Sequence, residues 1–330
     1  MWKQRLLGLG TFIPGYSHIP ILSKAAYHNT GGTDSASYCY SVWLRHLVMA
    51  SRNALSTMPQ TVAELGPGDS LGIGLAALLS GAEQYYAFDV VQFANSERNL
   101  MVFEELVDLF HKRVSIPDES QFPFVKPHLD CYDFPAGILT QERLRRALEP
   151  RRVDAIRKAL PGVGRDHAGE RPILYFAPWD DAAIIKENSV DMIYSQAVLE
   201  HVADLEYTYR SLYRWLKPGG VMSHEIDFKC HGQAAQWNGH WGHSDFSWRL
   251  IKGTRTNLLN RQPHSMHVDL LGRHGFRIVC DQRSTATSGI TRRQLSRRFQ
   301  HLSDEDLVTS SSFMQAVKAA VPASVNLRPS

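Results

Sequence analysis

The sequence predicts an α/β protein with a doubly wound, mostly parallel sheet of seven strands. Residues 61–80 read as a buried strand, a glycine turn and an apolar helix. Strands and helices alternate again from residue 173 onward, which favours a parallel sheet with right-handed crossovers. The 330 residues are 43% hydrophobic and 21% charged, a composition typical of a packed protein and not of a disordered one.

The first half of the chain contains the clearest periodicity. Trp43, Leu47 and Ala50 recur at helical spacing after the N-capping residues Asp34 and Ser35. The elements expected here are helices over 36–55, 71–80 and 96–111 and strands over 61–65 and 84–89.

Residues 112–170 break the alternation with many prolines and charges. They contain a basic helix over 140–160, interrupted at Pro150, and a loop over 161–169. Connections in compact α/β domains are much shorter, so we interpret 112–170 as an insertion between the second and third strands. The predicted organisation is an N-terminal helical cap over 1–58 and one domain over 59–330 that carries this insertion.

The second half returns to the α/β rhythm. The elements expected are strands over 173–176, 190–195, 221–226 and 276–279 and helices over 203–216 and 264–274. Residues 228–262 read as a loop-rich stretch. For the element near 313–319 the periodicity allows either a last strand or a short helix.

Bulk properties indicate a cytoplasmic protein. The four cysteines lie far apart without a C-x-x-C pair, which fits a reducing compartment. No apolar run approaches the ~20 residues of a membrane-spanning helix. Residues 1–10 are too short an apolar segment for a signal peptide, and we expect them to pack on the domain. A peripheral membrane contact is the alternative. The net charge of +3 does not indicate a nucleic-acid partner.

A ligand site is predicted where the first strand turns into its helix. Gly66 and Gly68 let the backbone approach a ligand closely, and the N–H groups of the following helix favour a polar or anionic group. Asp89 ends the next strand, where a carboxylate can accept hydrogen bonds from ribose hydroxyls.

These and later segments resemble the class I (Rossmann-like) S-adenosylmethionine-dependent methyltransferases. The residues that carry the resemblance are Glu64-Leu65-Gly66-Pro67-Gly68, Asp89, Trp179-Asp180, the segment 191–202 and Leu216-Lys217-Pro218-Gly219-Gly220. Leu71 stands where a dehydrogenase fingerprint has its last glycine, which disfavours a nicotinamide enzyme.

The resemblance implies S-adenosyl-L-methionine as cofactor and assigns roles in binding it. Glu64 and Gly66 would face its methionine part, and Gly68 would lie beside the adenosine. Asp89 would hold the ribose and Asp180 would lie near the adenine. Ser195 and Gln196 would line the sulfonium end.

Candidate catalytic residues follow the fifth strand, where such folds open their substrate side. A hydroxyl acceptor needs a general base, worth about 10²–10⁴ in rate, and His or a carboxylate is the usual choice. We predict His224, Asp227 and His240 as the catalytic residues. The further candidates in this region are Glu225, His231, His243 and Asp245. We predict no metal site, although Asp227 and Asp245 are the carboxylates that would suit Mg²⁺.

The predicted function is O-methylation of a small-molecule or glycan-like acceptor. Trp237, Trp241, Phe246 and Trp248 would form either a platform for a sugar or the packing of a lid. Two alternatives stay open. One is a non-catalytic cofactor-binding partner subunit. The other is an RNA methyltransferase, suggested by arginine runs within 143–152 and 292–298, although a solvated helix face explains such runs more simply.

Overall fold

The computed structural model describes residues 11, 32–164, 171–179, 181–255 and 258–319. Residues 1–10 and 12–31 of the predicted N-terminal cap, part of the loop over 161–169 and the predicted adenine-contacting Asp180 lie outside the described residues. Within the described parts of the chain, no helix has the length and apolar character needed to cross a bilayer.

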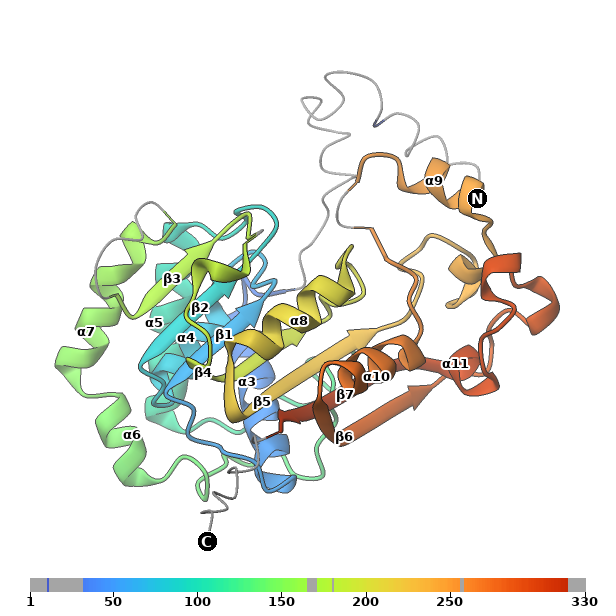
Figure 1. Ribbon diagram of the computed structural model, residues 1–330. Coiled ribbons are helices and arrows are strands. Elements are labelled where there is room, and N and C mark those ends of the chain that lie inside the picture. The colour runs from blue at the N-terminus through green and yellow to red at the C-terminus, as the bar shows by residue number, and fades with distance from the viewer. Residues whose placement is uncertain (1–10, 12–31, 165–170, 180, 256–257, 320–330) are drawn as a thin grey trace, which may run out of the picture.

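One seven-stranded sheet with the order β3-β2-β1-β4-β5-β7-β6 forms the centre of the molecule (Figure 1). The strands are β1 (Thr61–Leu65), β2 (Gln84–Phe88), β3 (Ile173–Phe176), β4 (Val190–Gln196), β5 (Leu216–Asp227), β6 (Phe276–Thr285) and β7 (Thr309–Lys318). Neighbours from β3 to β5 pair in parallel, whereas β7 pairs antiparallel with both β5 and β6. The predicted mostly parallel sheet is confirmed, and the undecided last element is a strand.

Helices cover both faces of the sheet, as a doubly wound fold requires. On one face α3 (Ala36–Arg52), α4 (Gly72–Leu79) and α5 (Ser96–Lys112) pack against one another. On the other face lie α8 (Leu205–Trp215) and α10 (His264–Arg273). Each layer has its own apolar cluster with the sheet. The strand order reverses between β1 and β4, and α/β proteins bind ligands beside such a reversal.

The region between α5 and β3 contains α6 (Gln141–Ala147), α7 (Pro150–Ala159) and a short 3₁₀ turn over Leu160–Gly162. The single interrupted helix predicted over 140–160 is thus two helices, because Pro150 begins α7 and Glu149 caps it. Residues 113–140 form a long connection before α6. Arg45 of α3 is fully buried and donates to the carbonyl oxygens of Pro117, Val125 and Pro127, which fixes this connection on the helix.

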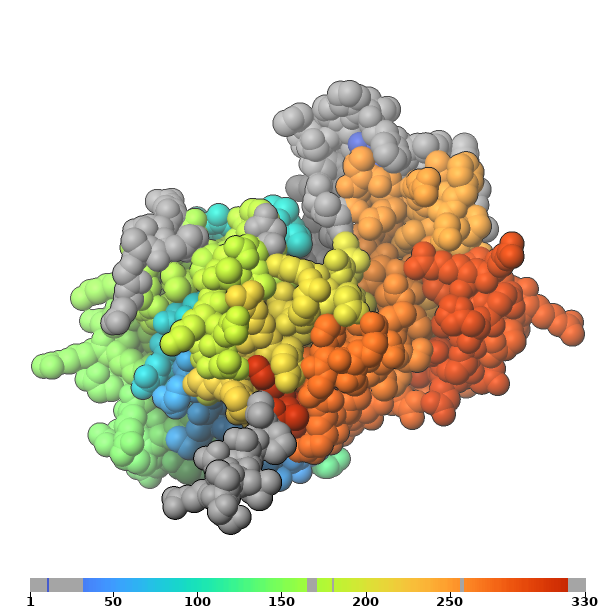
Figure 2. All heavy atoms as spheres, viewed as in Figure 1, coloured from blue at the N-terminus to red at the C-terminus, as the bar shows by residue number. Residues whose placement is uncertain are grey.

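The stretch after β5 contains more helix than the loop expected there. This stretch contains a 3₁₀ turn over Gly239–Gly242 and the helix α9 (Asp245–Lys252), and Ser244 caps α9. Later turns over Arg292–Gln294 and Arg297–Phe299 and the short α11 (Asp304–Val308) pack near them through a cluster around Trp241. A further 3₁₀ turn spans Ala182–Ile184. Figure 1 shows α9 and α11 beyond the end of β5, and in Figure 2 the orange and red spheres form a continuous surface there.

Candidate functional site

The bend after β1 requires glycine for conformation and for space. Gly66 and Gly68 adopt φ values of +64° and +73°, in the left-handed region that glycine favours. A Cβ on Gly66 would lie 2.6 Å from Cγ2 of Val198, in the segment after β4. The bare backbone therefore brings the end of β1 against the segment after β4, at the reversal of strand order.

Asp89 faces this bend. The backbone N–H of Gly68 donates to Oδ2 of Asp89 over 3.4 Å, and the N–H of Val90 donates to Oδ1 over 2.7 Å. The residue is 6% exposed, and burial raises its pKa to about 6. A carboxylate and a glycine bend are thus adjacent, as a ribose-binding site needs.

The start of α4 differs from the expectation of free N–H groups. The N–H of Leu71 donates to Oδ1 of Asn99 over 2.9 Å, and that of Gly72 donates to Oγ of Ser70 over 3.0 Å. Because the chain's own side chains satisfy these two donors, the predicted attraction of an anionic group to this helix end is weakened. The arrangement suits an uncharged sugar and base better than a phosphate.

Glu64 is enclosed in the sheet. Its Oε2 accepts hydrogen bonds from the hydroxyls of Tyr85, over 2.5 Å, and Tyr194, over 3.3 Å. Burial raises its pKa to about 8. The two tyrosines fix this carboxyl group beneath the bend, and its role toward the methionine part of a cofactor stays a prediction.

Ser195 and Gln196 end β4 with different partners. Oγ of Ser195 lies 2.7 Å from Nδ1 of His224, and both residues are buried. Nε2 of Gln196 donates to the carbonyl oxygen of Lys126 over 3.2 Å. Gln196 therefore links the end of β4 to the connection that Arg45 fixes on α3. No sequence signal identified Lys126, because its contact with Gln196 joins segments far apart in the chain.

A carboxylate–histidine pair lies at the end of β5. Oδ2 of Asp227 is 3.2 Å from Nε2 of His231, and Nζ of Lys229 donates to its Oδ1 over 3.1 Å. Burial opposes ionisation of Asp227, but the hydrogen bond to His231 and the charge of Lys229 outweigh it and hold the pKa at about 2. The His231 side chain is 34% exposed, so part of it is open to a ligand.

The three predicted catalytic residues are not all together. Asp227 and His240 line one small cavity, described below, whereas His224 is hydrogen-bonded to Ser195 within the sheet. Burial lowers the pKa values of both His224 and His240 to about 3, so both imidazoles are neutral near pH 7.

The carboxylates considered for Mg²⁺ do not converge. Asp245 accepts from Nη2 of Arg261 over 2.8 Å and from Nη1 of Arg298 over 3.3 Å, so its charge is already balanced. Nowhere in the described ranges do three or more His, Cys, Asp or Glu side chains group to hold a metal ion.

The aromatic residues after β5 serve mainly in packing. Trp241 is fully buried in the cluster with Phe299, and Trp248 is buried in a second small cluster. Phe246 is the exception, with 72% of its surface exposed. The structure therefore favours the packing interpretation for Trp241 and Trp248.

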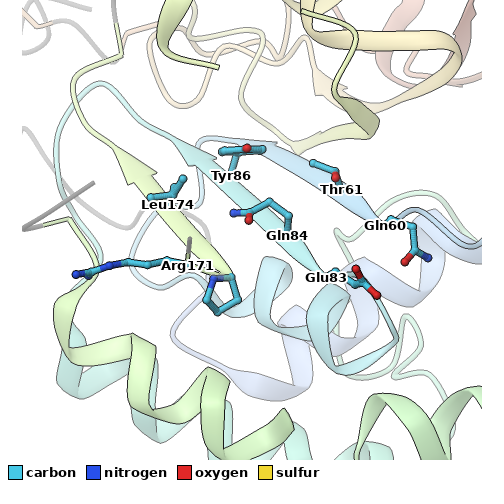
Figure 3. Close-up of a pocket in the computed structure, with 8 residues that line it drawn as sticks. Gln60, Thr61, Glu83, Gln84, Tyr86, Arg171 and Leu174 are labelled. Carbon is cyan, nitrogen blue, oxygen red and sulfur yellow. The ribbon is translucent and has the colours of Figure 1, made fainter. Parts of the chain in front are cut away.

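A separate hollow of about 540 Å³ lies at the amino ends of the strands (Figure 3). Thr61, Gln84 and Pro172 line it at the amino ends of β1, β2 and β3. The bend and Asp89 lie at the carboxyl ends of these strands, so this hollow is not part of the candidate site.

A comparison with protein families matches residues 153–223 to a model described as a methyltransferase domain. The matched range contains β3, β4 and α8 but not the bend or Asp89. None of the curated proteins compared with the chain matches it significantly.

Among solved structures, an S-adenosylmethionine-dependent methyltransferase from Mesorhizobium loti is 14% identical, with a TM-score of 0.39; the alignment covers 82% of this chain and 97% of that one. The phosphoethanolamine N-methyltransferase 2 of Haemonchus contortus, in complex with S-adenosyl-L-methionine, is also 14% identical, with a TM-score of 0.40 and coverages of 84% and 53%. TM-scores at this level add no argument about function.

Proposed function

We propose that this chain, a Rossmann-like methyltransferase that uses S-adenosylmethionine, transfers a methyl group to a hydroxyl oxygen of a small-molecule or glycan-like acceptor. One observation carries the choice of oxygen: the pair of Asp227 and His231 at the end of β5. A hydroxyl must lose its proton as the new bond forms, and a histidine oriented by a carboxylate is suited to accept it.

The cofactor fits the residues at the bend. Gly66 and Gly68 would give the backbone approach, and Asp89 would accept hydrogen bonds from the ribose. When bound, S-adenosylmethionine supplies a methyl group activated by a positively charged sulfur. The chain must then exclude water and hold the acceptor oxygen in line.

In the proposed base, Asp227 orients the imidazole and His231 accepts the proton. Asp227 stays ionised and holds Nε2 of His231, which leaves Nδ1 to take the acceptor's proton. His231 is preferred to His224 and His240 because its side chain is partly exposed, whereas those two are buried with pKa values of about 3. His240 is proposed to help form the acceptor site. His224 is proposed to hold the Ser195 side chain in place.

The arginine runs give little support to an RNA acceptor. Arg143 donates to the carbonyl oxygens of Ser80 and Thr57, each over 2.7 Å, so it is part of the fold. Arg145 and Arg146 both pair with Glu142. These three arginines thus have partners within the chain, which favours a small-molecule or glycan-like acceptor.

The substitution His231→Asn tests the proposal, since asparagine tolerates the positive φ of 47° at this position. We expect methyl transfer to a hydroxyl acceptor to fall by about 10²–10⁴. Affinity for S-adenosylhomocysteine, measured by calorimetry, should stay unchanged. Full activity of His231→Asn would refute the assigned base.

A further inference from the structure

A small cavity lies beside the proposed base, between the segment after β4 and the stretch after β5. Its volume is about 10 Å³, which is room for one oxygen atom with its hydrogens. Glu200, Asp227, His240 and Asn260 contribute to its wall. Asn260 closes it, because its backbone N–H donates to the carbonyl oxygen of Glu200 over 2.7 Å.

Three side chains in this wall have buried polar atoms without partners. Glu200 is 3% exposed, and neither of its carboxyl oxygens has a partner in hydrogen-bonding geometry. Nδ1 of His240 and Nε of Arg261, which also lines the cavity, are buried and unpartnered as well. A buried polar group without a hydrogen bond destabilises the fold, so such groups are retained where something else satisfies them.

The protonation states restrict what that occupant can be. Burial, together with the charges of Glu225 and Asp227, raises the pKa of Glu200 well above its usual range, and nearby backbone N–H groups do not offset this. Burial therefore favours the neutral carboxylic acid form of Glu200, which can both donate and accept a hydrogen bond. His240 is a neutral imidazole. Together with the guanidinium N–H of Arg261, these two groups complement a single hydroxyl oxygen, which can both accept and donate.

We propose that the cavity bounded by Glu200, Asp227 and His240 is a subsite that binds one neutral hydroxyl group of the acceptor. The inference rests on the proposed function, since it places this hydroxyl beside the base. Asp227 belongs both to the cavity wall and to the pair with His231. An acceptor with neighbouring hydroxyl groups, such as a saccharide, would anchor one in the cavity and present another to His231.

A water molecule could make the same hydrogen bonds in the cavity as an acceptor hydroxyl. The thermal stability of Glu200→Leu in the absence of acceptor distinguishes these two occupants. A permanent water would satisfy Glu200 in the free protein, so Glu200→Leu would destabilise it. A cavity completed only by the acceptor leaves Glu200 unsatisfied in the free protein. In that case Glu200→Leu should raise the melting temperature by about 2–4 °C without acceptor.

The test compares Glu200→Leu with Glu200→Gln, which keeps a neutral donor and acceptor of similar shape. The probes are methyl hexopyranosides and their monodeoxy derivatives, with S-adenosylmethionine as donor. The control is Glu206→Gln, an exposed carboxylate on α8 that pairs with Arg273. Affinity for S-adenosylhomocysteine is measured for each variant to show that the cofactor side is intact.

We expect Glu200→Leu to raise the acceptor KM about tenfold and Glu200→Gln to leave it near the wild-type value. For the deoxy probe that lacks the bound hydroxyl, Glu200→Leu and wild type should have the same KM. An unchanged KM in Glu200→Leu, or an equal loss in Glu200→Gln, would overturn the subsite while leaving the proposed function in place. If wild type binds S-adenosylhomocysteine but methylates none of the probes, the proposed acceptor class fails, and the subsite fails with it.

Discussion

The two ends of the candidate site are built in opposite ways. At the glycine bend of the proposed cofactor side, the hydrogen-bonding groups of Gly68, Asp89 and Leu71 are satisfied. The proposed acceptor side, around Glu200 and His240, keeps buried polar atoms without partners, as does Oε1 of Gln196 at the end of β4. The contrast supports a bend that is preformed in the free protein and an acceptor side that a ligand completes.

The strongest challenge to the preformed cofactor side is Gly66→Ala. The new Cβ would lie 2.6 Å from Val198 at a positive φ, so we expect a loss of about 2–4 kcal/mol in the free energy of unfolding. Binding of S-adenosylhomocysteine should be lost as well. Denaturant unfolding and calorimetry measure the two effects.

Gly219→Ala is the matched control, since Gly219 has a φ of +79° but no atom within 4 Å of a Cβ there. It should cost only the conformational strain, about 1 kcal/mol. Equal losses in the two variants would show that contact with Val198 does not shape the bend.

A second variant tests whether the acceptor side depends on its closing residue. Asn260 donates through Nδ2 to the carbonyl oxygens of Leu199, over 2.7 Å, and Val202, over 2.9 Å. Asn260→Ala should lower the free energy of unfolding by about 2 kcal/mol and raise the acceptor KM, with cofactor affinity unchanged.

Asn53→Ala provides the comparison for Asn260→Ala. It also removes two side-chain hydrogen bonds, to Met49 and Gln315, but beyond the last turn of α3. We expect a similar loss of stability with an unchanged acceptor KM. A raised KM in both variants would mean that global destabilisation, and not the closing contact, affects the acceptor.

The smallest expected effect is a pH dependence confined to the cofactor side. Burial raises the pKa of Asp89 to about 6, so its carboxylate is ionised at pH 7 and mostly protonated at pH 5. Because the ionised form accepts ribose hydrogen bonds, affinity for S-adenosylhomocysteine should fall about tenfold from pH 7 to pH 5. In Asp89→Asn this dependence should vanish, and its persistence there would assign it to another group.

Sequence reasoning predicted the geometry of the bend after β1 well, because its elements are local. The strand over 61–65, the glycine turn and the acid at the end of the next strand are short-range patterns, and the structure brings them together. The seven-stranded, mostly parallel sheet followed from alternation of strands and helices.

The acceptor side could not be predicted in the same way, because it depends on contacts between distant segments. The sequence placed His224, Asp227, His231 and His240 in one region without showing which are exposed. The imidazole that pairs with Asp227 belongs to His231, whose backbone is left-handed, and no pattern gave a signal for this conformation. The sequence could not identify Glu200 as part of an acceptor site, because His240 and Asn260, which line the same cavity, are distant from it in the chain.

Calorimetric titration of S-adenosylhomocysteine into wild type, Asp89→Asn and His231→Asn separates the residue proposed to hold the ribose from the proposed base. We expect equal binding to wild type and His231→Asn, and binding at least about tenfold weaker to Asp89→Asn. Binding to Asp89→Asn as tight as to wild type, or no binding to wild type, would contradict this expectation.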